Sequence, residues 1–353
     1  MFRTAKTLVG LDIGSSAVKA VELKAAGKGY KVTAFGAEPV PPDSIVDGAI
    51  IDGAAVSDAI RRLFTTRNFR SKDVAASLSG NAVIVKKIAL PVMTDAELAE
   101  SIYWEAEQYV PFDIQDVNLD YQVVERGDAA SGRTTMDVLL VAAKKEKIAD
   151  YTGVIAQAGR AAVVVDVDVF ALQNAFEANY AIEAGQTVVL LNAGASATNI
   201  NILHGDQSVF TRDLSIGGNA YTEALQKELN LPFDDADRLK CGGDVEGIPT
   251  ADVRAVLRAV GENVMLEIQK TFDFYKATAV SDRIDRIVVS GGASRAEGFI
   301  ELLTERFEAA VELFDPFRRV RFDAAKFGVS DLASVAPMAA VAVGLALRRA
   351  GDR

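Results

Sequence analysis

The chain has 353 residues, with 38 basic and 49 acidic side chains and a formal net charge of −11. Its single cysteine, Cys241, excludes an internal disulfide, and its single histidine, His204, excludes zinc sites built from several histidines. Such an acidic composition also argues against a nucleic-acid-binding protein, because phosphate contacts require a basic surface.

Residues 1–6 lead directly into a strand-like segment and lack the long apolar stretch and cleavage site of a signal peptide. The most apolar long run, Val335–Leu347, is shorter than the roughly 20 residues that a membrane-spanning helix needs. We therefore expect a buried helix there and a cytoplasmic location for the protein.

Residues 7–23 are an apolar strand, a turn of small residues and a second, alternating strand, which predicts a β-hairpin. The turn residues Gly14, Ser15 and Ser16 lack bulk, so their backbone N–H groups can approach an anion closely. Asp12, at the end of the first strand, is placed to hold a metal-bound water. Lys19 can reach phosphate oxygens if its side chain faces a cleft.

Residues 82–143 alternate between strand and helix patterns. We expect a strand over Ala82–Leu90, a helix over Asp95–Tyr109 and further strands near residues 118–125 and 135–143. Trp104 and Tyr109 lie five positions apart on the amphipathic helix, and we expect both to pack in a core.

Residues 187–203 repeat the pattern of residues 7–23 at a distance of 180 positions. The identical pairs are Thr7/Thr187, Val9/Val189, Leu11/Leu191, Gly14/Gly194, Ser16/Ser196, Ala17/Ala197 and Leu23/Leu203. Two such hairpins predict a duplicated α/β fold with a cleft between its halves. Facing turns would clamp a polyphosphate, the second through Gly194, Ala195, Ser196 and the hydroxyl of Thr198. The alternative is that any two hairpins rich in valine and glycine look alike.

Residues 251–295 predict a long helix and then a third glycine turn. Apolar residues at helical spacing over Ala251–Thr278 predict one packed helix. A strand over Ile284–Val289 precedes Gly291, Gly292 and Ser294, and we expect a helix from near Ala296. A strand, a double glycine and a helix N-terminus form an anion or ribose site in many α/β folds, although an ordinary tight turn has the same pattern. The chain contains no P-loop and no dinucleotide-binding glycine motif.

Together these motifs resemble the actin/Hsp70/sugar-kinase ATPase superfamily. The matching segments are residues 12–19 and 192–198 as its two phosphate loops, 289–294 as its adenosine motif, and 169–177 and 337–345 as its two interdomain helices. The resemblance implies an α/β fold of two lobes around a nucleotide cleft. It also implies that ATP and Mg²⁺ bind there, with Asp12 holding the metal through a water molecule.

Several stretches are similar to the PilM family of type IV pilus assembly proteins. They are residues 10–19, 104–112, 116–122, 165–176 and the segment that begins at Ile216. The similarity implies an actin-like core in which an inserted α/β subdomain, 1C, replaces the 1B of actin. The expected boundaries are 1–82 and 148–185 for subdomain 1A, 83–147 for 1C, 186–217 and 278–353 for 2A, and 218–277 for 2B.

The resemblance also assigns two groups of residues in the second half of the chain. Gly217 and Gly218 would form a turn packed near the phosphates, and a plain helix start is the alternative. Asp237 and Lys240 would contact ribose and adenine from subdomain 2B. For these two, a solvated helix face is the alternative, because charges three positions apart are common on helices.

One position departs from the superfamily pattern. The second phosphate loop normally begins with an aspartate, where this chain has Asn192. An asparagine can still accept and donate hydrogen bonds, but it carries no charge and cannot act as a base. We therefore expect ATP binding with slow or negligible hydrolysis. Asp168 is the remaining acidic candidate for catalysis, and the alternative for it is to cap the helix that starts at Val169.

The resemblance implies a cytoplasmic ATP-binding scaffold of type IV pilus assembly. It would bind the cytoplasmic N-terminal peptide of a PilN-like inner-membrane protein, in a groove between subdomains 1A and 1C, and would reach the membrane through such partners. Nucleotide state would change the affinity of the groove. The alternatives are a small-molecule kinase of the same superfamily and a filament-forming protein that resembles FtsA.

Overall fold

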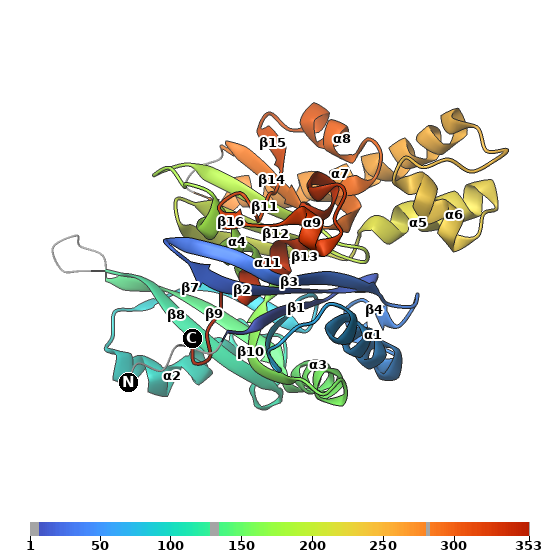
Figure 1. Cartoon of the computed structure of the whole chain (residues 1–353). Helices are drawn as coiled ribbons and strands as arrows, with labels where there is room; N and C mark the ends of the chain where they lie inside the picture. Colours follow the sequence, from blue (N-terminus) through green and yellow to red (C-terminus); the bar gives the residue numbers. More distant parts are fainter. Residues whose placement is uncertain (1–6, 128–133, 280–282, 353) are drawn as a thin grey trace.

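The computed structural model describes residues 7–127, 134–279 and 283–352. Two lobes face each other, and a smaller α/β unit lies beside the first (Figure 1). This arrangement confirms the expected α/β fold with two lobes and an insertion. The expectation about residues 1–6 lies outside the described residues. Within the part of the chain that is described, no helix is both long and apolar enough to cross a membrane.

The first lobe contains a six-stranded sheet. The strand order is β10 (Ala161–Val167), β6 (Asp73–Leu78), β1 (Val9–Ile13), β2 (Ala17–Ala26), β3 (Gly29–Pro39) and β16 (Val320–Arg321). Helices α1 (Gly53–Thr66) and α3 (Lys145–Gln157) pack on one face through a core that includes Ile60, Leu63 and Ile155. A two-stranded ribbon, β4 (Ile45–Val46) and β5 (Ala49–Ile50), lies between β3 and α1 in the sequence.

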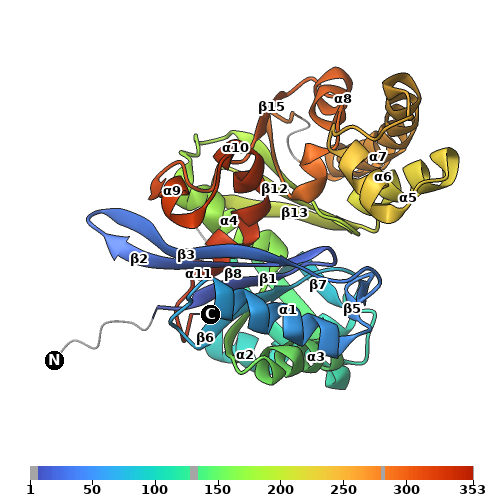
Figure 2. The ribbon, with the colours of Figure 1, turned by 45° about the vertical axis from the view of Figure 1, so that its right-hand side comes forward.

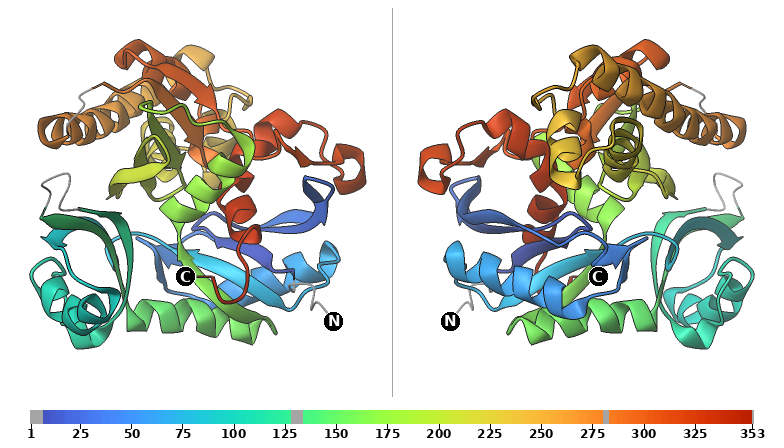
Figure 3. Two further views of the ribbon diagram at one scale, coloured as in Figure 1. Left: turned by 90° about the vertical axis from the view of Figure 1, so that its left-hand side faces the viewer. Right: turned by 90° about the vertical axis from the view of Figure 1, so that its right-hand side faces the viewer.

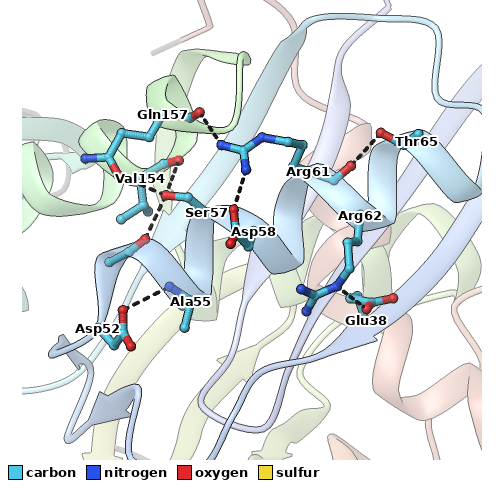
Figure 4. A network of polar contacts seen from close by, with 11 residues as sticks. Glu38, Asp52, Ala55, Ser57, Asp58, Arg61, Arg62, Thr65, Val154 and Gln157 are labelled. Atoms are coloured by element: carbon cyan, nitrogen blue, oxygen red, sulfur yellow. Dashed lines mark hydrogen bonds and ion pairs between the residues drawn. The ribbon is translucent and has the colours of Figure 1, made fainter.

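Polar contacts fix α1 against α3 (Figure 4). Asp52 caps the start of α1 by accepting a hydrogen bond from the Ala55 N–H at 2.9 Å. The buried Ser57 hydroxyl lies 2.7 Å from the Gly53 carbonyl and 3.2 Å from the Val154 carbonyl of α3. A further contact joins the two helices where the Arg61 guanidinium donates to the Gln157 carbonyl at 2.9 Å. These contacts hold the outer layer of the lobe in one register.

The second lobe repeats this plan with a five-stranded sheet. Its strand order is β13 (Gln207–Leu214), β12 (Thr198–His204), β11 (Thr187–Ala193), β14 (Arg286–Ser290) and β15 (Ala310–Leu313). Its helices are α5 (Gly218–Leu229), α6 (Phe233–Lys240), α7 (Thr250–Thr278) and α8 (Phe299–Arg306). The register confirms the repeat, because Asp12 pairs with Lys19 in the first hairpin and Asn192 with Asn199 in the second.

Two buried helices lie between the sheets of the lobes (Figure 2). They are α4 (Asp168–Asn179) and α11 (Ala340–Ala346), which cross where Gly344 meets Ala171. A Cβ on Gly344 would stand 1.7 Å from the Ala171 carbonyl oxygen, so only glycine allows this approach. The other face of α11 touches β1, where a Cβ on Gly10 would stand 2.0 Å from the Ala342 carbonyl oxygen. The connection between the lobes therefore depends on backbone-to-backbone contact.

The inserted unit is a three-stranded sheet covered by one helix (Figure 3). The order is β7 (Val83–Pro91), β9 (Thr135–Lys144) and β8 (Val117–Arg126), and α2 spans Asp95–Glu107. Thr94 and Glu97 form a capping box that begins α2. Leu98, Ile102 and Ala106 pack inward, but Trp104 is 73% exposed, so the prediction that it belongs to the core was wrong.

Several helices differ from their predicted bounds, and α2 ends at Glu107 rather than Tyr109. The helix expected from near Ala296 begins at Phe299, after a 3-10 turn at Gly292–Arg295 and a left-handed residue, Gly298 (φ 83°). The apolar run expected to form one helix from Val335 is instead a 3-10 turn, Ala336–Ala339, followed by α11. Pro337 explains this difference, because it has no N–H to donate within a regular helix. Two short helices, α9 (Ala324–Phe327) and α10 (Leu332–Val335), precede this turn.

Candidate functional site

A cavity of about 290 Å³ lies between the two lobes and brings most of the predicted site residues together. The predicted residues that line it are Asp12, Gly14, Ser15, Ser16, Lys19, Asp168, Asn192, Gly194, Ala195, Ser196, Gly218, Asp237, Lys240, Gly291 and Gly292. The other three predicted residues do not line the cavity but support the residues that do. Thr198 donates its hydroxyl to the Ile216 carbonyl, Ser294 donates to the Gly291 carbonyl, and Gly217 lies against the turn at Gly194.

The two predicted phosphate turns have the same backbone geometry. The Gly14 N–H bonds the Ala17 carbonyl at 3.2 Å, and the Gly194 N–H bonds the Ala197 carbonyl at 2.8 Å. The turns face each other, because the hydroxyls of Ser15 and Ser196 lie 2.9 Å apart across the lobes. Both turns therefore present small residues and hydroxyl groups to the same space.

The first hairpin carries a charged pair. Lys19 Nζ donates to Asp12 Oδ2 at 2.6 Å, and the two residues are direct cross-strand partners. The side chains are only 21% and 14% exposed, so each charge is partly neutralised within the cavity wall. Lys19 faces the cleft, as its predicted role required, but it shares its charge with Asp12.

The second hairpin carries neutral groups at the equivalent positions. Asn192 Nδ2 donates to Asn199 Oδ1 at 3.0 Å, and Asn199 Nδ2 donates to Asp213 Oδ1 at 2.8 Å. The three residues lie opposite one another on β11, β12 and β13. The Ser290 hydroxyl lies 3.3 Å from Asn192 Oδ1 and extends this row of hydrogen bonds.

Asp213 lines the cavity although the sequence patterns did not point to it. Its second oxygen accepts a hydrogen bond from the Gly80 N–H of the first lobe at 2.5 Å. Asn199 was also missed, yet it stands 180 positions after Lys19, so extending the internal repeat to the second strand would have found it. Asp213 has no such signal, because β13 lies outside the repeated segment.

Asp168 points into the cleft and does not cap α4. The N-cap residue of α4 is Val167, and the Ser77 hydroxyl donates to Asp168 Oδ1 at 2.5 Å. Burial and the nearby carboxylates of Asp12 and Asp213 raise the pKa of Asp168 to about 6, although the Ser77 hydroxyl acts in the opposite direction. The alternative interpretation of Asp168 as a helix cap is therefore wrong.

The raised pKa of Asp168 predicts a pH-dependent gain in stability for Asp168→Asn. A carboxyl whose pKa is higher in the folded state stabilises the fold below its unfolded pKa of 3.8, and this contribution is lost as the pH rises through about 6. At pH 8 we expect the Asp168→Asn variant to be more stable than the parent protein by about 2–3 kcal/mol, because the change removes a buried charge. Thermal denaturation between pH 4 and 8 measures this, and an equal difference at both pH values would contradict it.

A second titratable group near the cleft was not predicted. Lys147, at the start of α3, is 8% exposed and donates its ammonium to the Ser79 carbonyl. Burial lowers the pKa of Lys147, while the charges of Asp168 and Asp213 act against this shift. Lys147 therefore offsets part of the negative charge of the two aspartates.

The glycine turn after β14 closes the cavity from the second lobe. Gly291 has φ 89°, and a Cβ there would stand 2.2 Å from the Ala193 carbonyl oxygen. A side chain is therefore excluded at this position by both conformation and space. Gly291 and Gly292 instead offer a smooth backbone surface beside Met338 and Arg295.

Helix α6 supplies the wall farthest from the inserted unit. Lys240 is 8% exposed and donates to the Thr222 hydroxyl at 2.9 Å and to the Asp237 carboxylate. A solvated helix face is therefore the wrong description of Lys240. Cys241, the single thiol, follows it and also lines the cavity.

Comparisons with known proteins agree on the fold. The sequence model of a family described as type IV pilus assembly protein PilM matches residues 10–350. The solved structure of a PilM-PilN type IV pilus biogenesis complex superposes with a TM-score of 0.85 and 29% identity, over 98% of this chain and 99% of that chain.

More distant relatives share the actin-like architecture. The cell division protein FtsA of Enterococcus faecalis is 28% identical over 149 residues, which cover 36% of this chain and only 33% of that protein. FtsA of Enterococcus hirae is 24% identical over 351 residues, covering 87% of this chain and 78% of that protein. MreB5 of Spiroplasma citri, solved with AMPPNP, matches with a TM-score of 0.51 and 14% identity over 97% of this chain and 95% of that one. The fold is thus the two-lobed actin-like ATPase fold.

Proposed function

Because this chain belongs to the family of type IV pilus assembly protein PilM, we propose that it is an ATP-binding scaffold that holds the cytoplasmic N-terminal peptide of a PilN-like membrane protein. It would be cytoplasmic and would reach the inner membrane through that partner. The observation that supports this best is that the described residues form a cavity between the lobes and a separate one beside the inserted unit.

The cavity between the lobes fits a nucleotide. Its two small-residue turns offer backbone N–H groups to phosphates, and Lys240 and Asp237, to which the resemblance assigns ribose and base, line the same cavity. No group of three acidic or other ligating side chains occurs among the described residues. The family resemblance assigns Mg²⁺ to Asp12 through water, and a single carboxylate suits an ion that keeps most of its waters and binds phosphates.

The second cavity fits an extended peptide. It has a volume of about 1090 Å³ and lies between β10, β8 and α4. β10 and β8 are both edge strands of their sheets, so each has backbone groups free to pair with an added strand. Val163 and Val165 of β10 are 42% and 38% exposed there. An apolar edge of this kind is suited to strand addition by a peptide.

The charge of this groove favours a peptide with a cationic group. Asp120, Glu177, Asp206 and Asp352 line it, and Arg348 is the basic residue among its lining. Asp166 is 8% exposed, yet its Oδ2 makes no hydrogen bond and lies 3.5 Å from Arg348 Nε. A donor from a bound peptide would satisfy this buried oxygen.

Contacts between β13 of the second lobe and the segment around β7 connect movement of the lobes to this groove. Asp213 of the second lobe binds the Gly80 N–H in the segment that leads into β7, and the Thr211 hydroxyl lies 3.5 Å from the Val85 carbonyl of β7 itself. Because β13 touches both the cleft and the inserted unit, a ligand that shifts the lobes would shift the groove. Nucleotide would act by favouring one of two arrangements that bind the peptide differently.

Peptide titration tests this proposal. We expect Val165→Glu to weaken binding of a synthetic PilN N-terminal peptide by at least about tenfold, because it replaces an exposed apolar side chain that would pack against the peptide with a charged one that must lose water on contact. Val46→Glu, on the exposed β4, is the matched control and should bind normally. Unchanged affinity of the Val165 variant would reject this groove. Equal affinity with and without Mg-ATP would reject the coupling while leaving the scaffold function intact.

A further inference from the structure

The outer face of α2 exposes two large aromatic side chains. Tyr103 is 51% exposed and Trp104, the single tryptophan of the chain, is 73% exposed. Ala99 and Ala96 are also exposed, about one and two turns earlier on the helix. Tryptophan and tyrosine are the side chains most enriched where binding energy concentrates in protein interfaces.

The same helix is strongly acidic. α2 has five carboxylates, namely Asp95, Glu97, Glu100, Glu105 and Glu107, and no lysine or arginine. Asp95 pairs with Arg126, and Glu97 serves the capping box, so these two have a local role. Glu100 and Glu107 are exposed, and they flank Trp104 at helical spacings of four and three residues.

This face is separate from the peptide groove. Met136, Val138, Leu140 and Ala142 of β9 point toward α2, whereas Leu139, Val141 and Ala143 line the groove on the opposite side of the sheet. In Figure 1, α2 lies at the outer edge of the molecule, away from the cleft. A partner on α2 would leave both cavities open.

We propose that the aromatic–acidic face of α2 docks an arginine-containing, positively charged segment of a second partner protein. Arginine stacks on the face of tryptophan and pairs with the neighbouring carboxylates, so the two features of this helix select the same side chain. A symmetric dimer through α2 would place two acidic helices together, which is unfavourable. An anionic membrane surface would be repelled by the same carboxylates.

The fluorescence of Trp104 can report peptide binding directly on the full chain, because it is the single tryptophan. The probe is a short amidated peptide that alternates arginine with leucine, and its counterpart has glutamate in place of arginine. We expect the arginine peptide alone to give a saturable blue shift of Trp104 emission, because the indole becomes covered. The double variant Glu100→Lys/Glu107→Lys should bind it about tenfold more weakly and should gain the glutamate peptide.

A matched variant distinguishes binding at α2 from non-specific attraction of the peptide to the acidic protein. Glu223→Lys/Glu228→Lys makes the same change in net charge on exposed positions of α5 and should bind the arginine peptide like the parent protein. Equal binding by the α2 variant, no saturable shift, a shift with phosphatidylcholine or phosphatidylglycerol vesicles, or a shift that follows self-association in sedimentation would each overturn the proposal. Circular dichroism verifies that all variants are folded.

Discussion

Replacing Gly344 with alanine is expected to destabilise the protein by about 3–5 kcal/mol, among the largest effects of any single methyl group in the chain. The added Cβ would stand 1.7 Å from the Ala171 carbonyl oxygen of α4, so that backbone, not a flexible side chain, would have to shift. α11 is held on its other side by β1, where Gly10 already meets the Ala342 carbonyl. The clash would therefore force the two central helices apart.

Thermal or urea denaturation measures this effect, with Gly153→Ala as the matched control. Gly153 also lies within a helix, α3, but a Cβ there meets nothing within 4 Å. The control should therefore be neutral or stabilising by up to about 1 kcal/mol, from helix propensity alone. Equal stability of the two variants would show that the helix crossing is not as tight as described.

Asn192→Asp is the second change with a large expected effect, this time on chemistry. The parent protein should hydrolyse ATP slowly, since Asn192 cannot act as a base, and an aspartate there should raise turnover at least about tenfold. The same change should cost about 1–2 kcal/mol of stability, because Asn199 would then present its Oδ1 to a carboxylate. Phosphate release at saturating Mg-ATP measures the first effect and thermal denaturation the second.

A double variant distinguishes a catalytic gain from a change of packing. Asn192→Asp/Asn199→Lys reproduces in the second lobe the Asp12–Lys19 pair of the first, and it should recover most of the lost stability. Several turnovers per second by the parent protein, or no gain in the Asn192→Asp variant while nucleotide still binds, would refute the role given to Asn192.

The internal repeat made much of the cleft predictable. Gly14 and Gly194 follow strands of the same pattern, and a turn between two adjacent strands is a local structure that short sequence stretches determine. Gly291 was predictable from another local pattern, a strand followed by two glycines and a helical segment. Asp213 and Lys147 were not, because each reaches the cleft only through the packing of elements distant in the sequence. The contact of Asp213 with Gly80 depends on how the lobes meet, and that of Lys147 with Ser79 depends on how α3 packs beside β6 within the first lobe.

The error at Trp104 has a local cause. Leu98, Ile102 and Ala106 recur every four residues and define the buried side of α2. Trp104 lies two positions from Ile102, which places it on the other side of the helix. The spacing from Leu98, Ile102 and Ala106 was thus sufficient to exclude Trp104 from the core, and the prediction failed because it relied on the helix being amphipathic without assigning its buried side.

The strand β16 has a consequence for how the protein is made. Val320 and Arg321 form the edge strand of the first-lobe sheet, whose earliest strand in the sequence starts at Val9. Helix α11 covers β1 of the same sheet. At about 5–20 residues per second, a ribosome releases these segments tens of seconds after β1 has emerged. The first lobe therefore lacks β16 and α11, and its apolar surface stays uncovered, until these late segments are synthesised. Removal of α11 from the C-terminus should consequently uncover apolar surface on the N-terminal lobe, although that lobe is made first.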